Sequence, residues 1–197
     1  MNDPDFQVAH AAVSPESRAL LEQAQARVQR MIQAREPLRD ILTVLATASE
    51  AASHGSTVAS ILVLDGDGLL RNGASPNLPA DFLDEIDRLK PAADVGTCAA
   101  AAATGEVVMT PSFNDDGRWA ELRHLPHSLG FLGAWSMPIK SPDGFVLGTL
   151  GSYFREHRKP TSEELEIGAV LARIAALALC ANPIDARPSP PAGNQTA

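Results

Sequence analysis

The sequence is poor in the residues that build disulfide, redox or metal centres. Only two of its 197 residues are cysteines, Cys98 and Cys180, and they lie far apart. Neither belongs to a Cys-x-x-Cys pair or to a Cys/His cluster with the spacing of a metal site. The sequence therefore predicts no metal site and favours a reducing cytoplasm.

Basic residues and long apolar runs are scarce as well. Lys and Arg total 16 against 24 Asp and Glu, which gives a formal net charge of -8. No broad basic surface is available to neutralise a phosphate backbone, so we expect no nucleic-acid partner. No apolar run approaches the length that spans a bilayer, and residues 1–5 are acidic where a signal peptide is basic. We therefore expect a soluble cytoplasmic protein without a membrane partner.

What the sequence does contain is enough apolar residues, 45%, for one domain with a sizeable core. Residues 1–13 lack any period and are expected to be disordered. Ser14-Pro15-Glu16 then supplies an N-cap, a proline at the first helical position and early acidic charge. Residues 14–36 are predicted to form an amphipathic helix, whose apolar stripe is Leu20, Leu21, Ala24, Val28, Met31 and Ile32.

Further elements follow from changes in the apolar period. A second helix runs from residue 38 to His54-Gly55, and residues 57–70 predict a hairpin that turns at Asp65-Gly66-Asp67-Gly68. Residues 78–86 predict a short helix on a connection. Residues 96–104 are nearly all small, which predicts a helix that can approach a sheet closely, ending at Gly105.

The second half of the chain continues this pattern. Residues 106–110 read as a strand, and residues 119–125 as a short helix that ends at Pro126. A hairpin is expected over residues 131–154. Thr161 and Glu164 form a capping box for a closing helix, whose stripe is Ile167, Val170, Leu171, Ile174, Leu177 and Ala178. The tail, residues 182–197, is rich in Pro, Ser, Gly and Asn and is expected to be disordered.

Four motifs in a fixed order carry a resemblance to a known family. They are Gly96-Thr97-Cys98 with Gly105-Glu106; Asp116 with Arg118-Trp119; Trp135-Ser136 with Asp143-Gly144; and Tyr153-Phe154 with Pro160-Thr161. Each motif alone is weak, but their shared order and spacing are specific. Residues 37–181 resemble a GAF domain, a sensory and ligand-binding module of the type found in histidine kinases and diguanylate cyclases.

The resemblance implies an α+β fold with a central antiparallel sheet of about six strands. The N- and C-terminal helices would cover one face, and a ligand pocket roofed by residues 75–130 would lie on the other. It also implies a homodimer formed through the terminal helices. The expected function is that of a stand-alone sensor, which binds a small cytoplasmic molecule and signals to a separate protein partner through those helices.

Several family positions are changed in this chain. Ala99-Ala100 replaces a Gly-Thr pair, Ser112 replaces an Asp, and Leu132-Gly133-Ala134 replaces an Arg-Ala-Cys segment. The polar or reactive groups of those positions are missing, so a relative's ligand cannot be carried over. The sequence identifies no cofactor.

The candidate ligand-binding residues are Gly96, Thr97, Cys98, Trp119 and Trp135. Cys98 sits at a helix start, where free amides favour a thiolate that could sense oxidants, but a small buried hydrophobe facing the sheet is the favoured interpretation. The same helix start could hold an anion or a carbonyl oxygen, unless Thr97 or Asp94 simply caps it. Trp119 and Trp135 could wall a pocket or pack in the core.

Other reactive residues favour structural roles. Cys180, on the stripe of the last helix, is expected in the core or in a dimer seam. His124 and His127 flank Pro126, which is expected to prevent a helix from presenting both rings to one metal. Asp115 and Asp116 are interpreted as a solvated turn rather than an acid–base pair. No residue is assigned a catalytic role.

Two other functions stay open. An enzyme of the free methionine-R-sulfoxide reductase type needs a nucleophilic and a resolving cysteine close together, and this chain offers one pocket cysteine, Cys98. The third possibility is an interaction module whose pocket is filled by its own side chains, which the alanines at 99–103 allow.

Overall fold

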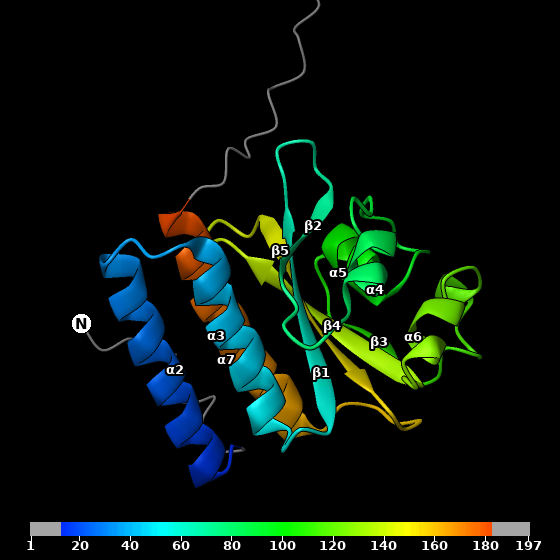
Figure 1. Ribbon diagram of the computed structural model, residues 1–197, viewed down its shortest axis with the longest axis horizontal. Coiled ribbons are helices and arrows are strands. Elements are labelled where there is room, and N and C mark those ends of the chain that lie inside the picture. Colours follow the sequence, from blue (N-terminus) through cyan, green and yellow to red (C-terminus); the bar gives the residue numbers. More distant parts are fainter. Residues whose placement is uncertain (1–12, 183–197) are drawn as a thin grey trace, which may run out of the picture.

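A five-stranded antiparallel sheet forms the middle layer of the molecule, which is described by a computed structural model over residues 13–182 (Figure 1). The spatial order of the strands is β2-β1-β5-β4-β3. The α+β class is confirmed, with five strands where about six were expected. The strands are β1 (Thr57–Leu64), β2 (Leu70–Ala74), β3 (Val108–Thr110), β4 (Gly133–Lys140) and β5 (Val146–Phe154).

The predictions for both chain ends, residues 1–13 and 182–197, lie outside the described residues except at Val13 and Asn182. Val13 is buried in the core beside the terminal helices. Among the helices of residues 13–182, none combines the length and apolar character that crossing a bilayer requires.

The terminal helices cover one face of the sheet, as expected. They are α2 (Pro15–Gln33), α3 (Leu38–Ala52) and α7 (Ser162–Ala181), and each packs against the other two (Figure 1). The amphipathic pattern of the first helix positions it, because Leu21, Ala24, Val28 and Met31 are the apolar residues that it buries. Helices α3 and α7 contact the strands directly, and α2 lies outside them.

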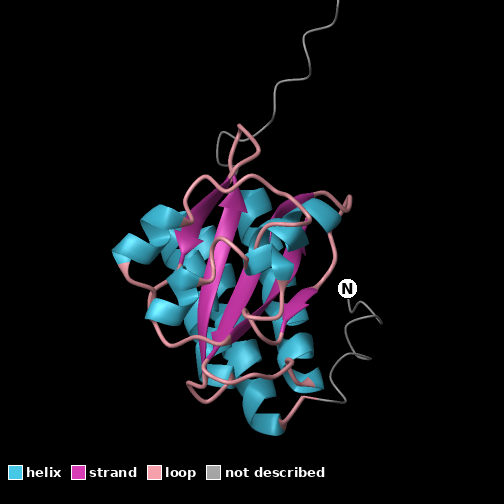
Figure 2. Ribbon diagram, turned by 90° about the vertical axis from the view of Figure 1, so that its right-hand side faces the viewer, coloured by secondary structure: helices cyan, strands magenta, loops and turns pink. Residues whose placement is uncertain are grey.

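The opposite face is covered by the long connections between strands. These carry α4 (Ala80–Glu85), α5 (Thr97–Thr104), the 3-10 helix η2 (Gly117–Trp119) and α6 (His124–Ser128). Figure 2, seen from this side, places these short helices in front of the strands. Helix α5 contacts β3, β4 and β5, as its run of small residues predicts.

One helix boundary was predicted wrongly. Pro126 does not end a helix but is the third residue of α6, which begins at His124. Proline is tolerated there because the first-turn amides of a helix have no intrahelical acceptor. His124 and His127 therefore lie on one helix, so the expected break at Pro126 is not what separates their rings.

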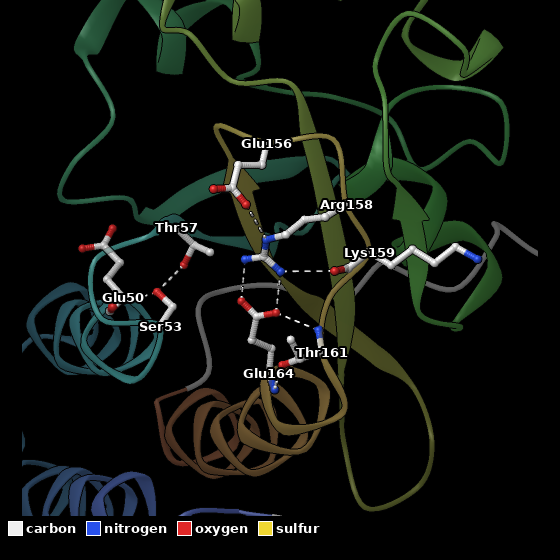
Figure 3. A network of polar contacts seen from close by, with 8 residues as sticks. All are labelled: Glu50, Ser53, Thr57, Glu156, Arg158, Lys159, Thr161 and Glu164. Atoms are coloured by element: carbon white, nitrogen blue, oxygen red, sulfur yellow. Dashed lines mark hydrogen bonds and ion pairs between the residues drawn. The ribbon is translucent and has the colours of Figure 1, made fainter.

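The start of α7 is held by a polar network (Figure 3). Thr161 and Glu164 form the predicted capping box. The Glu164 carboxylate also accepts hydrogen bonds from both terminal nitrogens of Arg158, at 2.7 and 2.8 Å. The Arg158 guanidinium in turn lies 4.2 Å from the centre of the Phe154 ring, at the end of β5. The first turn of α7 is thereby fixed to the sheet.

Both faces of the middle strands are buried, so two cores meet across one sheet. Along β4, Trp135, Met137 and Ile139 point to the terminal helices, whereas Ala134 points to α5. Along β5, Leu150 points to the terminal helices and Tyr153 points to α5. This follows from the two-residue period of a strand.

Helix α7 packs closely against β4 at Gly168. A Cβ atom at Gly168 would lie 2.4 Å from Cη2 of the Trp135 ring, which is shorter than any real contact. Because the ring is buried, it cannot move aside. Gly168 is therefore required by packing and not by backbone conformation.

We expect Gly168→Ala to lower the free energy of unfolding by about 1–3 kcal/mol through overpacking, although alanine is the better helix former. Urea unfolding followed by circular dichroism measures this change. Gly117→Ala is the matched control, because a Cβ atom there would meet nothing within 4 Å. Equal stability of the two variants would contradict the assigned packing.

The pKa of Glu164 provides a second prediction. Burial acts to raise it, but the hydrogen bonds from Arg158 and from the Thr161 amide dominate and hold the pKa below its ordinary 4.5. A carboxyl whose pKa is lowered by folding stabilises the fold above its unfolded pKa and loses this contribution as pH falls through its folded pKa. We expect Glu164→Gln to cost about 1–2 kcal/mol at pH 7.

This difference from the wild type should shrink as the pH falls below 4.5. Unfolding curves of both proteins between pH 7 and pH 3 test it, since those values bracket the titration of carboxyl groups (about pH 4). A difference that stays constant with pH would contradict the assigned ion pair.

Candidate functional site

The space between α5 and the sheet is the place where a GAF-like pocket was expected. The first turn of α5 positions Cys98 over the middle strands, where its side chain contacts the sheet. A Cβ atom at Gly151 would lie 2.9 Å from Cys98 Sγ. The absence of a side chain at this point of β5 therefore allows α5 to pack directly against the strands. The hydroxyls of Ser136 and Thr149, both fully buried, lie beside the same sulfur.

Cys98 is a buried thiol. Burial raises its pKa above the ordinary value, and the nearby hydroxyls of Ser136 and Thr149 offset this only in part. The thiol is therefore protonated at neutral pH, because the free amides at the helix start do not outweigh burial. Of the two interpretations of Cys98, the structure agrees with the small buried hydrophobe.

The start of α5 is tied to the connection above it. Gly96 occupies the N-cap position with φ of 52°, and no side chain caps the helix, so neither Thr97 nor Asp94 is the cap that was considered. Instead, Thr97 Oγ1 accepts a hydrogen bond from Trp119 Nε1 at 3.2 Å. The Gly96 amide donates to the Arg118 carbonyl at 2.8 Å. Gly96, Thr97 and Trp119 are thus brought together at the start of α5.

An ion pair positions Trp119. Asp116 accepts from Arg118 Nη2 at 2.6 Å and from Thr110 Oγ1 at 2.7 Å, and it caps η2 through the Arg118 amide. Burial acts to raise the pKa of Asp116, but these hydrogen bonds hold it below its ordinary value. Asp116 is therefore a structural anchor rather than part of a solvated turn with Asp115.

Aromatic rings fill the space under the roof, and sequence reasoning missed most of them. The ring centres of Phe131 and Tyr153 lie 5.3 Å apart, those of Phe82 and Tyr153 5.7 Å, and those of Phe113 and Trp119 4.5 Å. The position of Tyr153 was predictable, because it lies two residues after Gly151 on β5 and therefore points to the same face of the sheet. Phe82 lies on the short helix α4, and Phe113 and Phe131 come from irregular connections, which carry no period.

Trp135 does not join the other candidate residues. It lies on the opposite face of β4, against Gly168 of α7. The strand period places it there, because its neighbour Ser136 faces Cys98. The predicted five-residue site is therefore divided: Gly96, Thr97, Cys98 and Trp119 lie on the α5 face, and Trp135 packs in the core beside the terminal helices.

Other predicted residues also lie apart from this site. Cys180 is exposed rather than in the core, and Leu177, one turn earlier on α7, is 55% exposed. His124 is exposed, and the His127 ring packs edge-on to Phe113 at 6.0 Å. Residues 13–182 contain no group of three or more potential metal-ligating side chains.

Comparison with known proteins agrees with this geometry. The family model of the GAF domain matches residues 37–179, which is most of the chain, so the chain belongs to the GAF domain family. It is 31% identical, over 157 residues, to the methyl sulfide methyltransferase-associated sensor of Methanosarcina acetivorans. This match covers 79% of the chain but only 16% of that relative.

Solved structures show the same fold at lower identity. The GAF domain of an Acinetobacter phosphoenolpyruvate-protein phosphotransferase is 15% identical with a TM-score of 0.63, over 85% of this chain and 95% of that one. The free methionine-R-sulfoxide reductase of Neisseria meningitidis, solved with its substrate, is 19% identical with a TM-score of 0.64, over 86% and 93%.

The two cysteines should differ sharply in reactivity. Cys180 is exposed and Cys98 is buried with a raised pKa, so iodoacetamide at neutral pH should modify Cys180 and spare Cys98. Peptide mass spectrometry reports each site, and unfolded protein is the control in which both react. Modification of native Cys98 as fast as Cys180 would contradict its burial.

Proposed function

We propose that this chain is a sensory GAF domain that binds a small molecule between α5 and the sheet and transmits occupancy through α2, α3 and α7. Membership of the GAF family and the sensor name of the Methanosarcina relative support this role. The observation that carries the proposal is the packing of the two middle strands. Their Gly151 touches Cys98 of α5, and their Trp135 touches Gly168 of α7.

The lining of the α5 face defines the chemistry of the ligand. The buried side chains there are apolar or aromatic apart from hydroxyls such as those of Thr97, Ser136 and Thr149. The nearby charges of Asp116 and Arg118 neutralise each other. Cys98 is uncharged. A charged ligand would lose its hydration on entering this largely apolar space. The ligand is therefore a small, neutral, largely apolar molecule.

Binding requires the roof to move, because side chains occupy the space between α5 and the sheet. Residues 75–130 form that roof, and their short helices α4, η2 and α6 are joined by irregular segments. A ligand that prefers a displaced roof shifts the population toward it, in proportion to its preference. The displaced α5 then alters the strands on which α7 rests.

The output passes to a partner protein in the cytoplasm, and the domain acts as a homodimer through its terminal helices. Exposed Leu177 and Cys180 on α7 support this arrangement, since they lie on the side of the helix that the other residues of 13–182 leave open.

A reductase activity is not supported by the cysteine geometry. Reduction of a sulfoxide by thiols needs an attacking thiolate and a second cysteine to resolve the product. Cys98 is buried under α5, and Cys180 lies on the outer side of α7 in the other layer. The likeness to the Neisseria reductase is one of fold.

A thermal-shift screen of small neutral aromatic and aliphatic compounds tests the proposal, with native mass spectrometry of the purified protein to identify any retained molecule. We expect at least one neutral compound to raise the melting temperature, because binding to the folded state stabilises it. Stabilisation by anions alone, or by no compound, would contradict the proposed ligand class.

A matched pair of variants locates the site. Phe131→Leu changes a ring that is 2% exposed on the α5 face, and Phe145→Leu makes the same change where the ring is 72% exposed, at the β4–β5 turn. For a compound found in the screen, we expect Phe131→Leu to raise the Kd about tenfold and Phe145→Leu to leave it unchanged. Calorimetry measures both.

A further inference from the structure

A small, partly open cavity with polar and apolar lining lies on the other face of the sheet, where α3 and α7 meet the strands. It leaves about 10 Å³ for the centre of a water-sized sphere. Its polar lining comes from two helices and three strands: Ser49, Ser53, Thr57, Trp135, Ser152 and Glu164. Figure 3 shows three of these residues, Ser53, Thr57 and Glu164, around the end of α3 and the start of α7.

Trp135 lines this cavity, and its indole nitrogen lacks a partner among the described residues. The side chain is 98% buried, since only 2% of the residue is exposed, and Nε1 has no hydrogen-bond acceptor among the described residues. Indole N–H groups are donors only, and buried polar groups are paired in nearly all native proteins. The other tryptophan, Trp119, follows this rule by donating to Thr97.

The cavity offers acceptors for a bridging molecule. Ser53 Oγ donates to the Glu50 carbonyl at 2.8 Å, so in its 2.7 Å contact with Thr57 Oγ1 it is Thr57 that donates. The Thr57 oxygen therefore keeps its lone pairs for a further donor. The buried hydroxyls of Ser49 and Ser152 line the same space.

We propose that the cavity is a hydration site that holds one water molecule. The water accepts the Trp135 Nε1 hydrogen and donates to lining oxygens of the strands and of the helices α3 and α7. The volume suits a single water, which needs about 10–15 Å³ of such space and two to four polar partners. A cation is excluded, because the single lining carboxylate, Glu164, is paired with Arg158.

This site is separate from the ligand site proposed on the α5 face, and it stands without that proposal. Because its walls belong to α3, α7 and the strands, the bound water joins the sheet to both helices by hydrogen bonds. It would be displaced by any separation of α7 from the strands that opens the cavity to solvent.

Water–indole cross-relaxation in ¹⁵N-labelled full-length protein tests the site. The chain has two tryptophans, so the indole signals are assigned with Trp119→Phe. Trp119 is the internal control. Its indole N–H donates to the Thr97 hydroxyl, and the proton of that hydroxyl exchanges with water. A cross-peak at Trp119 therefore gives the intensity that arises by relay through a hydroxyl group. We expect a water cross-peak at Trp135 that exceeds the one at Trp119. Equal or weaker intensity at Trp135 would overturn the proposal.

A crystal structure with ordered solvent provides the second measurement. We expect an oxygen within hydrogen-bond distance of Trp135 Nε1 and of at least one lining hydroxyl. An empty cavity, or an indole turned so that Nε1 bonds a protein oxygen directly, would contradict the hydration site.

Discussion

The structure depends on the close approach of two helices to the same pair of strands from opposite sides. At Gly168 of α7 and at Gly151 of β5, an added Cβ atom would meet Trp135 at 2.4 Å and Cys98 at 2.9 Å. Because glycine has no Cβ atom, the Trp135 ring can occupy the space beside Gly168, and the Cys98 sulfur can occupy the space beside Gly151. At these two contacts the sheet is packed tightly against both layers, as expected of a close-packed interior.

This packing explains how a domain of this family can report what it binds. Ser136 of β4, beside Cys98, pairs with Gly151, and the adjacent residue Trp135 pairs with Ser152. Neighbouring residues of one strand thus touch α5 and α7 respectively. In the mechanism proposed above, a displacement of α5 reaches the terminal helices through these strands.

The elements with a clear period could be predicted from the sequence, and the site could not be predicted completely. The stripe of α2, the hairpin around β1 and the capping box of α7 are local signals, and all three are confirmed. Trp135 was assigned to the pocket because both faces of β4 are buried and alternation carries no polarity signal there. Phe113 and Phe131 lie on irregular connections, and only the tertiary fold brings them to the site.

Exposure along α7 was the other feature beyond sequence reasoning. Leu177 and Cys180 continue the apolar character of the helix but point away from its neighbours. Sequence alone does not separate a helix buried on three sides from one with an apolar outer surface, because both lack a polar stripe.

The most direct test of the account is a double-mutant cycle between the two sides of the sheet, with Gly151→Ala and Gly168→Ala made singly and together. We expect their effects on the free energy of unfolding to be coupled by at least about 1 kcal/mol, because both substitutions displace the same strands. Effects that add to within about 0.3–0.5 kcal/mol would contradict it, since α5 and α7 would then be independent.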